Sequence, residues 1–462
     1  MRMYDIIEKK RDRKELSKLE IEYFVNEYSK DNIKDYQAAA LIMAIYLNGL
    51  TKEELLNLTF AMANSSKKLD LSDLKRKKGY IIDKHSTGGV GDKVTLIVLP
   101  IVAALGIDCF KMSGRGLGFT GGTADKIESI DGYNVNLSVE EAKRQVEKIG
   151  ICLISQSKDI AIADKKIYAL RDTTATVESI DLIAASIMSK KIACGADRLV
   201  LDVTVGNGAF AKTEEEANLL AKTMVEIGRL ASLQTCAVIT SMNEPLGRAV
   251  GNALEIKEVV EFLNQSEIEF NSNINSDLKE VVMSVATWML KMADKTLDIN
   301  DCKERIKKAI VSKKAYQKFV ELVEAQGGKF KKIKFGIQDY EIKYPVLKDK
   351  VSYLKEIKAE RNGCITDINS KKIGEALVIL GGGRTTKEDD IDYSVGFYFD
   401  KKVGDMVNIG DTILKVYYND KEKFENAFSY ISDGIIIQDV DKKIGDAMKQ
   451  RPHVLNVVGE NV

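Results

Sequence analysis

Two glycine-rich segments, separated by a single apolar stretch, constrain the fold of this chain most strongly. The first reads KHSTGGVGD over residues 84–92, and the second reads SGRGLGFTGGT over residues 113–123. The apolar stretch from Val94 to Ile107 has the length of one helix. Glycine lets backbone N–H groups approach a ligand closely, and successive N–H groups at a turn or a helix start bind anions. Both segments carry hydroxyls, and each follows an apolar strand-like piece, which predicts a phosphate site in preference to two ordinary turns.

The common nucleotide-binding motifs do not match these segments. A P-loop requires Gly-Lys-Ser/Thr in sequence, whereas Lys93 stands between Asp92 and Val94. A dinucleotide fingerprint that began at Gly114 would need glycine at position 119, which is Phe119. The pattern therefore predicts an anion site that belongs to neither class.

The order of elements predicts an α/β fold with a discontinuous helical domain, a mainly parallel central sheet and a C-terminal α+β domain of hammerhead-like type. Residues 17–20 and 51–54 match the capping box, and the alanine-rich run 37–47 is apolar all round, so we expect it to be a buried helix. A strand–loop–helix rhythm begins at Tyr80 and is interrupted by helices near 164–194. The predicted domains are 1–72 with 164–195 (helical), 76–163 with 196–342 (α/β), and 346–462 (C-terminal).

Composition narrows the function classes. Lys+Arg and Asp+Glu are balanced at 69 each, so no overall field favours nucleic acid or an anionic membrane, and we expect neither as a partner. The six cysteines are scattered without a CxxC pair, and the first residues show no signal-peptide core, which indicates a cytoplasmic protein. Only His85 and His453 occur; a catalytic histidine would be His85, because His453 lies beside Pro452 at an expected surface position.

The same loops resemble the signature of the thymidine and pyrimidine-nucleoside phosphorylases, and the chain is most similar to the pyrimidine-nucleoside type. The likeness covers nearly the whole sequence, including residues 35–39, 113–129, 168–172, 186–191, 245–247, 251–255 and 380–384. It implies a homodimer in which a helical domain, used for dimerisation and for binding the pyrimidine, faces an α/β phosphate-binding domain across a cleft. Hinge closure would bring nucleoside and phosphate together.

The resemblance also implies a set of phosphate-binding residues. An ammonium among loop N–H groups supplies charge at short range in a partly desolvated cleft, which suits Lys84 to this role. Thr95 stands near the start of the expected helix, where the helix dipole favours an anion. The full implied set is Lys84, His85, Ser86, Thr95, Lys111, Met112, Ser113 and Thr123.

A second implied set binds the pyrimidine nucleoside: His85, Lys111, Arg171, Ser186 and Lys190. Ser186 and Lys190 are four residues apart and share one face of a helix. Spacing alone favours a plainer interpretation, in which Lys190 ends the helix and complements its dipole. The resemblance instead implies that His85, Arg171 and Lys190 are catalytic and stabilise the charge that develops on the departing base, His85 as a proton donor to its O2.

Lys111 is the implied marker of substrate breadth. Strict thymidine phosphorylases tend to carry an apolar residue there, and the broader enzymes carry lysine, which could contact a ribose 2′-hydroxyl. The resemblance therefore favours an enzyme that uses uridine as well as deoxy-pyrimidine nucleosides. Phe119 departs from the family pattern, because a histidine is often seen at that position.

No organic cofactor is expected, but the resemblance implies one monovalent cation, K⁺. Its ligands would be backbone carbonyls at Gly91, Lys93, Leu246 and Ala249 and the carboxylate of Glu258. Lys93 stands where relatives often have a smaller residue, and an ammonium that pointed inward would compete with the ion.

The function that these features predict is reversible phosphorolysis of uridine, thymidine and deoxyuridine to free base and pentose 1-phosphate. A strict thymidine phosphorylase is the first alternative. A Mg²⁺-dependent phosphoribosyltransferase of related fold is the second, although the first loop offers only Asp92 as an acidic residue. A non-enzymatic nucleotide sensor or carrier is the third, suggested only by the C-terminal module.

Overall fold

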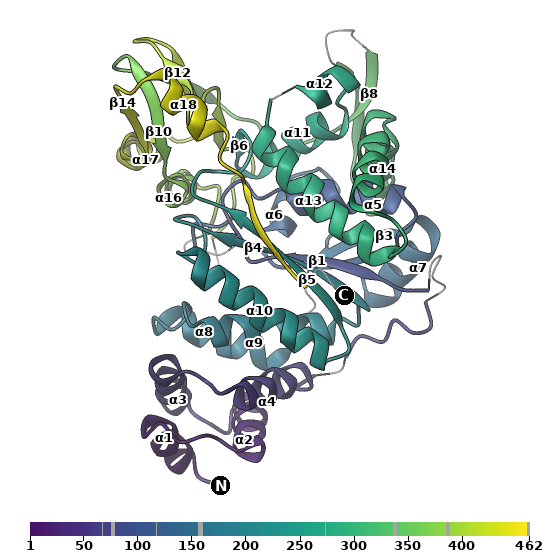
Figure 1. Cartoon of the computed structure of the whole chain (residues 1–462), viewed down its shortest axis with the longest axis vertical. Helices are drawn as coiled ribbons and strands as arrows, with labels where there is room; N and C mark the ends of the chain where they lie inside the picture. Colours follow the sequence, from purple (N-terminus) through teal and green to yellow (C-terminus); the bar gives the residue numbers. More distant parts are fainter. Residues whose placement is uncertain are drawn as a thin grey trace.

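The computed structural model describes residues 1–66, 68–74, 79–116, 118–155, 160–272, 274–335, 340–384 and 389–459. Figure 1 shows a helical lobe at one end, a central sheet covered by helices, and a β-rich domain at the other end. The predicted fold class, including the discontinuous helical part, is confirmed. Among the described residues, no helix is both long and apolar enough to cross a membrane.

The helical lobe combines two segments that are far apart in sequence. Ser17 and Thr51 form the predicted capping boxes with Glu20 and Glu54, which satisfies the first N–H groups of two helices. A shared apolar core joins the lobe to one face of the central sheet. Its helices are α1 (Met3–Arg11), α2 (Lys18–Ser29), α3 (Asp35–Asn48), α4 (Lys52–Ala63), α8 (Ile162–Thr173) and α9 (Ile180–Ala193).

Helix α3 departs from the expectation that it is buried on all sides. One face of the helix is buried, and it consists of Ala38, Leu41, Ile42, Ala44 and Ile45. On another face the side chains are exposed to solvent and follow one another at helical spacing: Tyr36, Ala40, Met43 and Leu47. One apolar stripe of α3 therefore has no partner within the described part of the chain.

The central sheet is parallel except at one edge. Strands β1 (Ile82–Ser86), β4 (Arg198–Val205) and β5 (Gln234–Ser241) are parallel neighbours, as are β2 (Cys109–Ser113) and β3 (Ile151–Ser155). A parallel bridge between Ile81 and Asp108 joins the two groups. Strand β15 (Val454–Val458) pairs antiparallel with the free edge of β5. In Figure 1 the segment that carries β15 runs from the C-terminal domain down to the sheet.

Helices cover both faces of this sheet. Helix α10 (Glu214–Leu230) lies between the sheet and the helical lobe, and its apolar side joins that core. The opposite face carries a separate core built around α5, which is almost wholly apolar and buried. The remaining elements of the domain are α5 (Val94–Ala104), α6 (Thr123–Glu128), α7 (Val139–Ile149), α11 (Asn252–Leu263), α12 (Glu267–Asn271), α13 (Ser276–Ala293), α14 (Ile299–Val311), α15 (Lys314–Ala325) and the hairpin of β7 (Phe330–Phe335) and β8 (Tyr340–Pro345).

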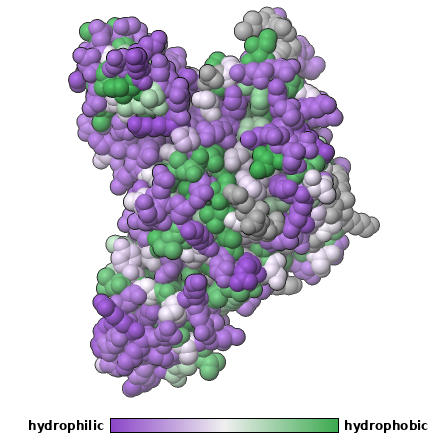
Figure 2. All heavy atoms as spheres, viewed as in Figure 1, coloured by the Kyte–Doolittle hydropathy of each residue, from purple (hydrophilic) through white to green (hydrophobic). Residues whose placement is uncertain are grey.

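The C-terminal domain contains two antiparallel sheets with their own apolar core. One sheet includes β6 (Ala249–Val250), a short strand that comes from the α/β part and pairs with β11. In the view of Figure 2, hydrophilic residues cover most of this domain, and hydrophobic residues show mainly in the middle of the molecule. The remaining elements are β9 (Tyr353–Lys358), β10 (Gly363–Ile368), α16 (Ser370–Leu380), β11 (Gly396–Phe399), β12 (Met406–Val407), β13 (Thr412–Tyr418), α17 (Lys421–Asp433), β14 (Ile435–Gln438) and α18 (Lys442–Lys449).

A buried ion pair inside the helical lobe gives a test of this packing. Lys10 Nζ lies 2.8 Å from both carboxylate oxygens of Glu54, and the backbone N–H groups of Leu16 and Thr51 also donate to that carboxylate. Glu54→Gln is expected to lower the free energy of unfolding by about 3 kcal/mol, because Lys10 would keep its charge in a buried position without a partner charge. Urea unfolding followed by circular dichroism measures the change. Glu53→Gln, an exposed neighbour, is the control; equal losses in both variants would contradict the role of the pair.

Candidate active site

The first glycine-rich segment begins within β1 at Lys84, which is fully buried, and leaves the strand after Ser86. Its Nζ lies 2.9 Å from Asp202 Oδ2 on the neighbouring strand β4. Apart from this contact with Asp202, no described group accepts a hydrogen bond from the ammonium, so donors remain for an anion. Burial alone would lower the pKa of Lys84, but the carboxylates of Asp202 and Asp92 outweigh it and raise the pKa. The ammonium is therefore a permanent positive charge at the loop.

The two glycine loops lie against each other. A Cβ on Gly88 would stand 3.9 Å from Thr120 Cγ2, and Lys126 Nζ, just beyond the second loop, donates to the backbone carbonyl of Asp92 at 2.6 Å. The second loop also folds onto itself, because a Cβ on Gly122 would come within 2.1 Å of the Gly116 nitrogen. Glycine is required at this crossing for steric reasons.

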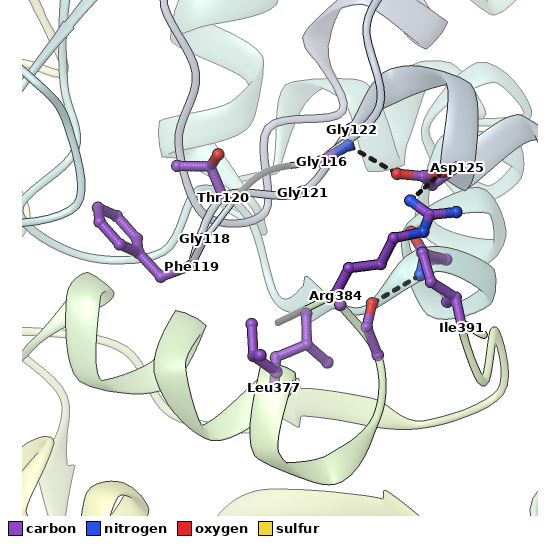
Figure 3. Close-up of a pocket in the computed structure, with 14 residues that line it drawn as sticks. Gly116, Gly118, Phe119, Thr120, Gly121, Gly122, Asp125, Leu377, Arg384 and Ile391 are labelled. Atoms are coloured by element: carbon purple, nitrogen blue, oxygen red, sulfur yellow. Dashed lines mark hydrogen bonds and ion pairs between the residues drawn. The ribbon is translucent and has the colours of Figure 1, made fainter. Parts of the chain in front are cut away.

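The second loop is anchored to the C-terminal domain through Asp125 (Figure 3). This carboxylate accepts hydrogen bonds from the Gly116 N–H at 2.7 Å, from Arg115 at 2.9 Å and from Arg384 at 3.0 Å. The hollow lined by Gly116, Asp125 and Arg384 also includes Thr120 and Leu377 but not Ser113 or Thr123. The contact therefore fixes the shape of the second loop. The predicted phosphate hydroxyls of Ser113 and Thr123 lie outside this hollow.

The four predicted phosphate hydroxyls stand at element ends on one side of the sheet. Ser86 and Ser113 end the parallel strands β1 and β2, while Thr95 and Thr123 stand in the first turns of α5 and α6. Carboxyl ends of parallel strands share an edge, which is the usual place for ligands in such sheets. Ser86 Oγ accepts a hydrogen bond from the Gly88 N–H at 3.1 Å, which holds this hydroxyl within its loop.

Lys111 lies beneath the first loop and is buried. Its Nζ donates to the carbonyl oxygen of Lys84 at 2.5 Å and lies 3.4 Å from Asp83 Oδ1. Burial lowers its pKa to about 7, with nearby Lys191 and Lys84 adding to the fall. The next residue, Met112, is buried, with its sulfur 3.6 Å from Cys194 Sγ. The contact of Lys111 with a ribose hydroxyl stays a prediction; its observed contact is with the backbone of Lys84.

Of the five residues predicted to bind the pyrimidine, Arg171 lies on α8, Ser186 and Lys190 lie on α9, and His85 and Lys111 lie on β1 and β2. Lys190 Nζ bonds Ser186 Oγ at 2.8 Å and Asp164 Oδ2 at 2.6 Å. The ring of Tyr168 lies 5.9 Å from Lys190 Nζ and 5.7 Å from the guanidinium carbon of Arg171. Arg171 and Lys190 thus lie near one aromatic ring although they come from two helices, and Ser186 is joined to them through Lys190.

Arg171 is buried and donates three hydrogen bonds to backbone carbonyls, those of Thr176 at 3.1 Å, Val177 at 2.7 Å and Leu182 at 3.0 Å. These bonds hold the segment between α8 and α9. Burial lowers its pKa to about 10, which still leaves the guanidinium charged at neutral pH. Arg171 therefore shapes the site as well as supplying its charge.

His85 is half-buried and surrounded by positive charge. Burial lowers its pKa well below 6.5, and Lys191, Lys111 and Lys190 push it in the same direction. The imidazole is therefore neutral at neutral pH, so it can donate a hydrogen bond but is a poor source of a transferable proton. The role of His85 as a proton donor to the base stays a prediction.

Comparison with known proteins agrees with this geometry. Residues 4–66 match "Glycosyl transferase family, helical bundle domain", residues 78–316 match "Glycosyl transferase family, a/b domain", and residues 364–438 match "Pyrimidine nucleoside phosphorylase C-terminal domain". A pyrimidine-nucleoside phosphorylase of Staphylococcus haemolyticus (strain JCSC1435) is 46% identical over 95% of this chain and 96% of its own. One of Staphylococcus aureus (strain bovine RF122 / ET3-1) is 43% identical over 99% of this chain and 98% of its own. The chain belongs to the pyrimidine-nucleoside phosphorylase family.

The fold is shared more widely. The crystal structure of anthranilate phosphoribosyltransferase from Thermus thermophilus is similar with a TM-score of 0.54, and it covers 70% of this chain and 99% of its own. Sequence identity is 17%, so this likeness concerns the fold alone.

Within this family member, sequence reasoning missed the carboxylates that organise the basic groups. Asp83 Oδ2 lies 2.7 Å from Lys191 Nζ, which joins β1 to helix α9 of the helical lobe through a buried ion pair. Asp202 pairs with Lys84, and Asp164 pairs with Lys190. A signal was present for Lys84, which was expected in a partly desolvated cleft, because a buried ammonium requires a compensating charge. The sequence does not say which distant carboxylate supplies it.

The cation site implied by the family does not fit a potassium ion in this chain. Lys93 Nζ lies 2.7 Å from Leu246 O, 2.9 Å from Ala249 O and 2.6 Å from Glu258 Oε2. Three oxygens expected around K⁺ thus surround an ammonium nitrogen. Gly91 lies against the same carbonyls, since a Cβ there would stand 2.7 Å from Leu246 O.

The pKa of Lys111 makes anion binding depend on pH. Below about pH 7 its amine is protonated and adds a positive charge under the first loop. Sulfate, which does not titrate in this range, is expected to bind on the order of tenfold more tightly at pH 6 than at pH 8. Lys111→Met is expected to remove most of that difference.

Isothermal titration calorimetry at pH 6 and pH 8 measures the sulfate affinity of the wild type and of Lys111→Met. Lys257→Met, which changes a lysine with an exposed side chain on α11, serves as the matched control. An unchanged pH dependence in Lys111→Met would contradict the assignment.

Proposed function

We propose that this chain catalyses the reversible phosphorolysis of pyrimidine nucleosides, giving a free pyrimidine and a pentose 1-phosphate. The observation that carries the proposal is the position of the buried Lys84 ammonium, which lies beside Asp202 at the start of the first glycine loop. The positive charges of both Lys84 and Lys190 act on His85, which lies between the expected phosphate and pyrimidine sites. The full-length relatives bear the same activity in their names.

The phosphate occupies the edge formed by the two glycine loops. Lys84 offers a fixed positive charge with free donors, and loop N–H groups and the α5 N-terminus add partial positive charge. The hydroxyls of Ser86, Thr95, Ser113 and Thr123 complete the donors. In this buried setting an ammonium interacts with phosphate more strongly than it would in water.

The pyrimidine binds beside Tyr168, where Ser186, Lys190 and Arg171 face its polar groups. A phosphate oxygen attacks C1′ of the sugar as the bond from C1′ to N1 of the base breaks, and the electron pair of that bond passes to the base. Lys190 and Arg171 stabilise the resulting negative charge, and neutral His85 donates a hydrogen bond to O2. A proton from solvent completes the free base.

Substrate breadth includes uridine, thymidine and deoxyuridine, with Lys111 as the sequence feature that favours ribonucleosides. We also propose that the enzyme works in the cytoplasm. Its six cysteines are buried and unpaired, which suits a reducing compartment.

Replacing Lys84 tests the proposed reaction. Lys84→Met is expected to lower kcat/KM for phosphorolysis of uridine and thymidine by at least about 100-fold, because phosphate loses its main charged donor. Release of uracil or thymine and formation of pentose 1-phosphate are followed by chromatography. Lys222→Met, on the exposed side of α10, is the control with expected wild-type activity. Base release that does not depend on phosphate would overturn the proposal.

The exposed stripe of α3 supports a homodimer. Leu47 is 71% exposed and Tyr36 is 74% exposed, although both are apolar residues on a well-formed helix. Exposed apolar stripes of this kind commonly cover each other across a two-fold axis. We propose that α3 packs against a second copy of this chain.

Leu47→Glu is expected to shift the protein from dimer to monomer, since the new carboxylate would be buried without a partner. Size-exclusion chromatography with light scattering gives the mass at several concentrations. Leu219→Glu changes another exposed leucine, on α10, and is expected to leave the dimer intact. A wild-type protein that is monomeric at every concentration would contradict the interface.

A further inference from the structure

Lys93 holds a buried cation in a site built from oxygen atoms. The side chain is fully buried, and each of its three N–H bonds has an acceptor: Leu246 O, Ala249 O and Glu258 Oε2, at 2.6–2.9 Å. A lysine ammonium has three donors and no acceptor, so this arrangement satisfies it completely. Lys93 directly follows the first glycine loop and immediately precedes α5.

The carboxylate in this site is itself fully occupied. Glu258 Oε1 accepts from the Arg248 N–H at 2.8 Å and from Asn275 Nδ2 at 2.9 Å, and Oε2 accepts from the Ala249 N–H at 2.9 Å. Together with Lys93 it forms a neutral pair. A further cation at this position would find no uncompensated negative charge among these groups.

The space around the Lys93 ammonium also leaves no room for a metal ion. A Cβ on Gly247 would stand 3.0 Å from Lys93 Nζ and 2.8 Å from Glu258 Oε1, and the backbone of Gly247 has a φ of +72°. Glycine is needed here because the chain wraps closely around the ion pair in a conformation that other residues rarely adopt. The ammonium is thus enclosed by the loop of residues 246–249.

We propose that the Lys93 ammonium takes the place of a monovalent metal ion, so that a covalently attached cation holds the first glycine loop in this chain. Lys93 is a positioning residue: it acts on phosphate only through the loop that it fixes. The fixed charge ties the end of that loop to residues 246–249, and the Leu246 N–H also donates to Val90 O at 3.1 Å. The enzyme should therefore need no added K⁺.

A second lysine braces the same segment from the C-terminal domain. Lys402 Nζ donates to the carbonyl oxygens of Pro245 and Gly247, and it pairs with Glu244 at 3.1 Å and Asp277 at 3.2 Å. Although burial opposes it, the charge of Asp277 raises the pKa of Lys402. Two ammonium groups thus surround residues 244–249, and only Lys93 reaches the glycine loop.

Salt dependence of the dialysed wild-type protein is the first arm of the test. Its thermal unfolding midpoint and its phosphorolysis rate are measured in KCl, NaCl and choline chloride at equal ionic strength. We expect no difference between K⁺ and choline beyond experimental error. A gain that is specific to K⁺ would overturn the proposal. The unfolding midpoint tests the cation site without relying on the proposed function. If the protein shows no phosphorolysis, the midpoint still decides whether K⁺ binds.

Two variants of Lys93 form the second arm. Lys93→Ser leaves a cavity lined by carbonyl and carboxylate oxygens, whereas Lys93→Met fills it with an apolar chain of similar length. In choline chloride both are expected to unfold at lower temperature than the wild type. KCl or NH₄Cl, but not choline chloride, should restore the Lys93→Ser midpoint and leave Lys93→Met unchanged. A purely structural lysine would give no such rescue.

An equal midpoint of Lys93→Ser in all salts would contradict a cation site at this position. Failure of Lys93→Ser to fold in every salt would also count against it, because a metal ion in the same oxygen cage should recover the fold.

Discussion

Compensation of buried lysine charge governs the arrangement of the first glycine loop. Lys84 at its beginning pairs with Asp202 of β4, and Lys93 at its end pairs with Glu258 of α11. Burying an unpaired ammonium is very costly, so each of these pairs binds the loop to a separate element with a defined geometry. Most of the backbone between the two lysines is buried, and internal bonds hold it, such as that from the Thr87 N–H to Asp202 O at 3.0 Å and that from the Gly88 N–H to Ser86 Oγ at 3.1 Å. The glycines allow the backbone conformation of the loop, and the two ion pairs fix the position of the loop relative to β4 and α11.

The same principle links the helical lobe to the α/β domain. Lys191 of α9 pairs with Asp83, the residue before Lys84, while the adjacent Lys190 points to Ser186 and Asp164. Neighbouring lysines on one helix thus serve opposite sides: Lys191 contacts the α/β domain, and Lys190 contacts Ser186 and Asp164 within the helical lobe. Because Asp83 directly precedes Lys84, a displacement of α9 would shift the first glycine loop together with the contacts of Lys190. His85 lies among these charges, which explains its neutral state.

Sequence reasoning reached the fold class and the capping boxes because local patterns specify them: Ser17 and Thr51 each needed only a glutamate three residues later. It could not assign burial to α3, since an apolar helix gives the same pattern whether it meets its own domain or a second chain. The placement of Ser86 and Ser113 at strand ends followed from glycine and strand order. The partners Asp83, Asp164 and Asp202 did not, because long-range charge pairing leaves no periodic trace. Lys93 is the clearest example of what the sequence leaves open. The residue could be recognised as unusual, but the direction of its side chain depends on the position of residues 246–249, which is a long-range property of the fold.

The pairing of β15 with β5 has a consequence for the way this protein is made. Strand β5 lies at the edge of the parallel sheet, and the segment that covers it follows the entire C-terminal domain in sequence. During synthesis the α/β domain can form its cores while this edge still presents unpaired N–H and C=O groups, which readily pair with other chains. Val454–Val458 then closes the sheet only after the C-terminal domain has emerged. A chain that ended before β15 would leave β5 as an unpaired edge strand, which is prone to aggregation. Pairing of β15 with β5 therefore distinguishes complete molecules from truncated ones.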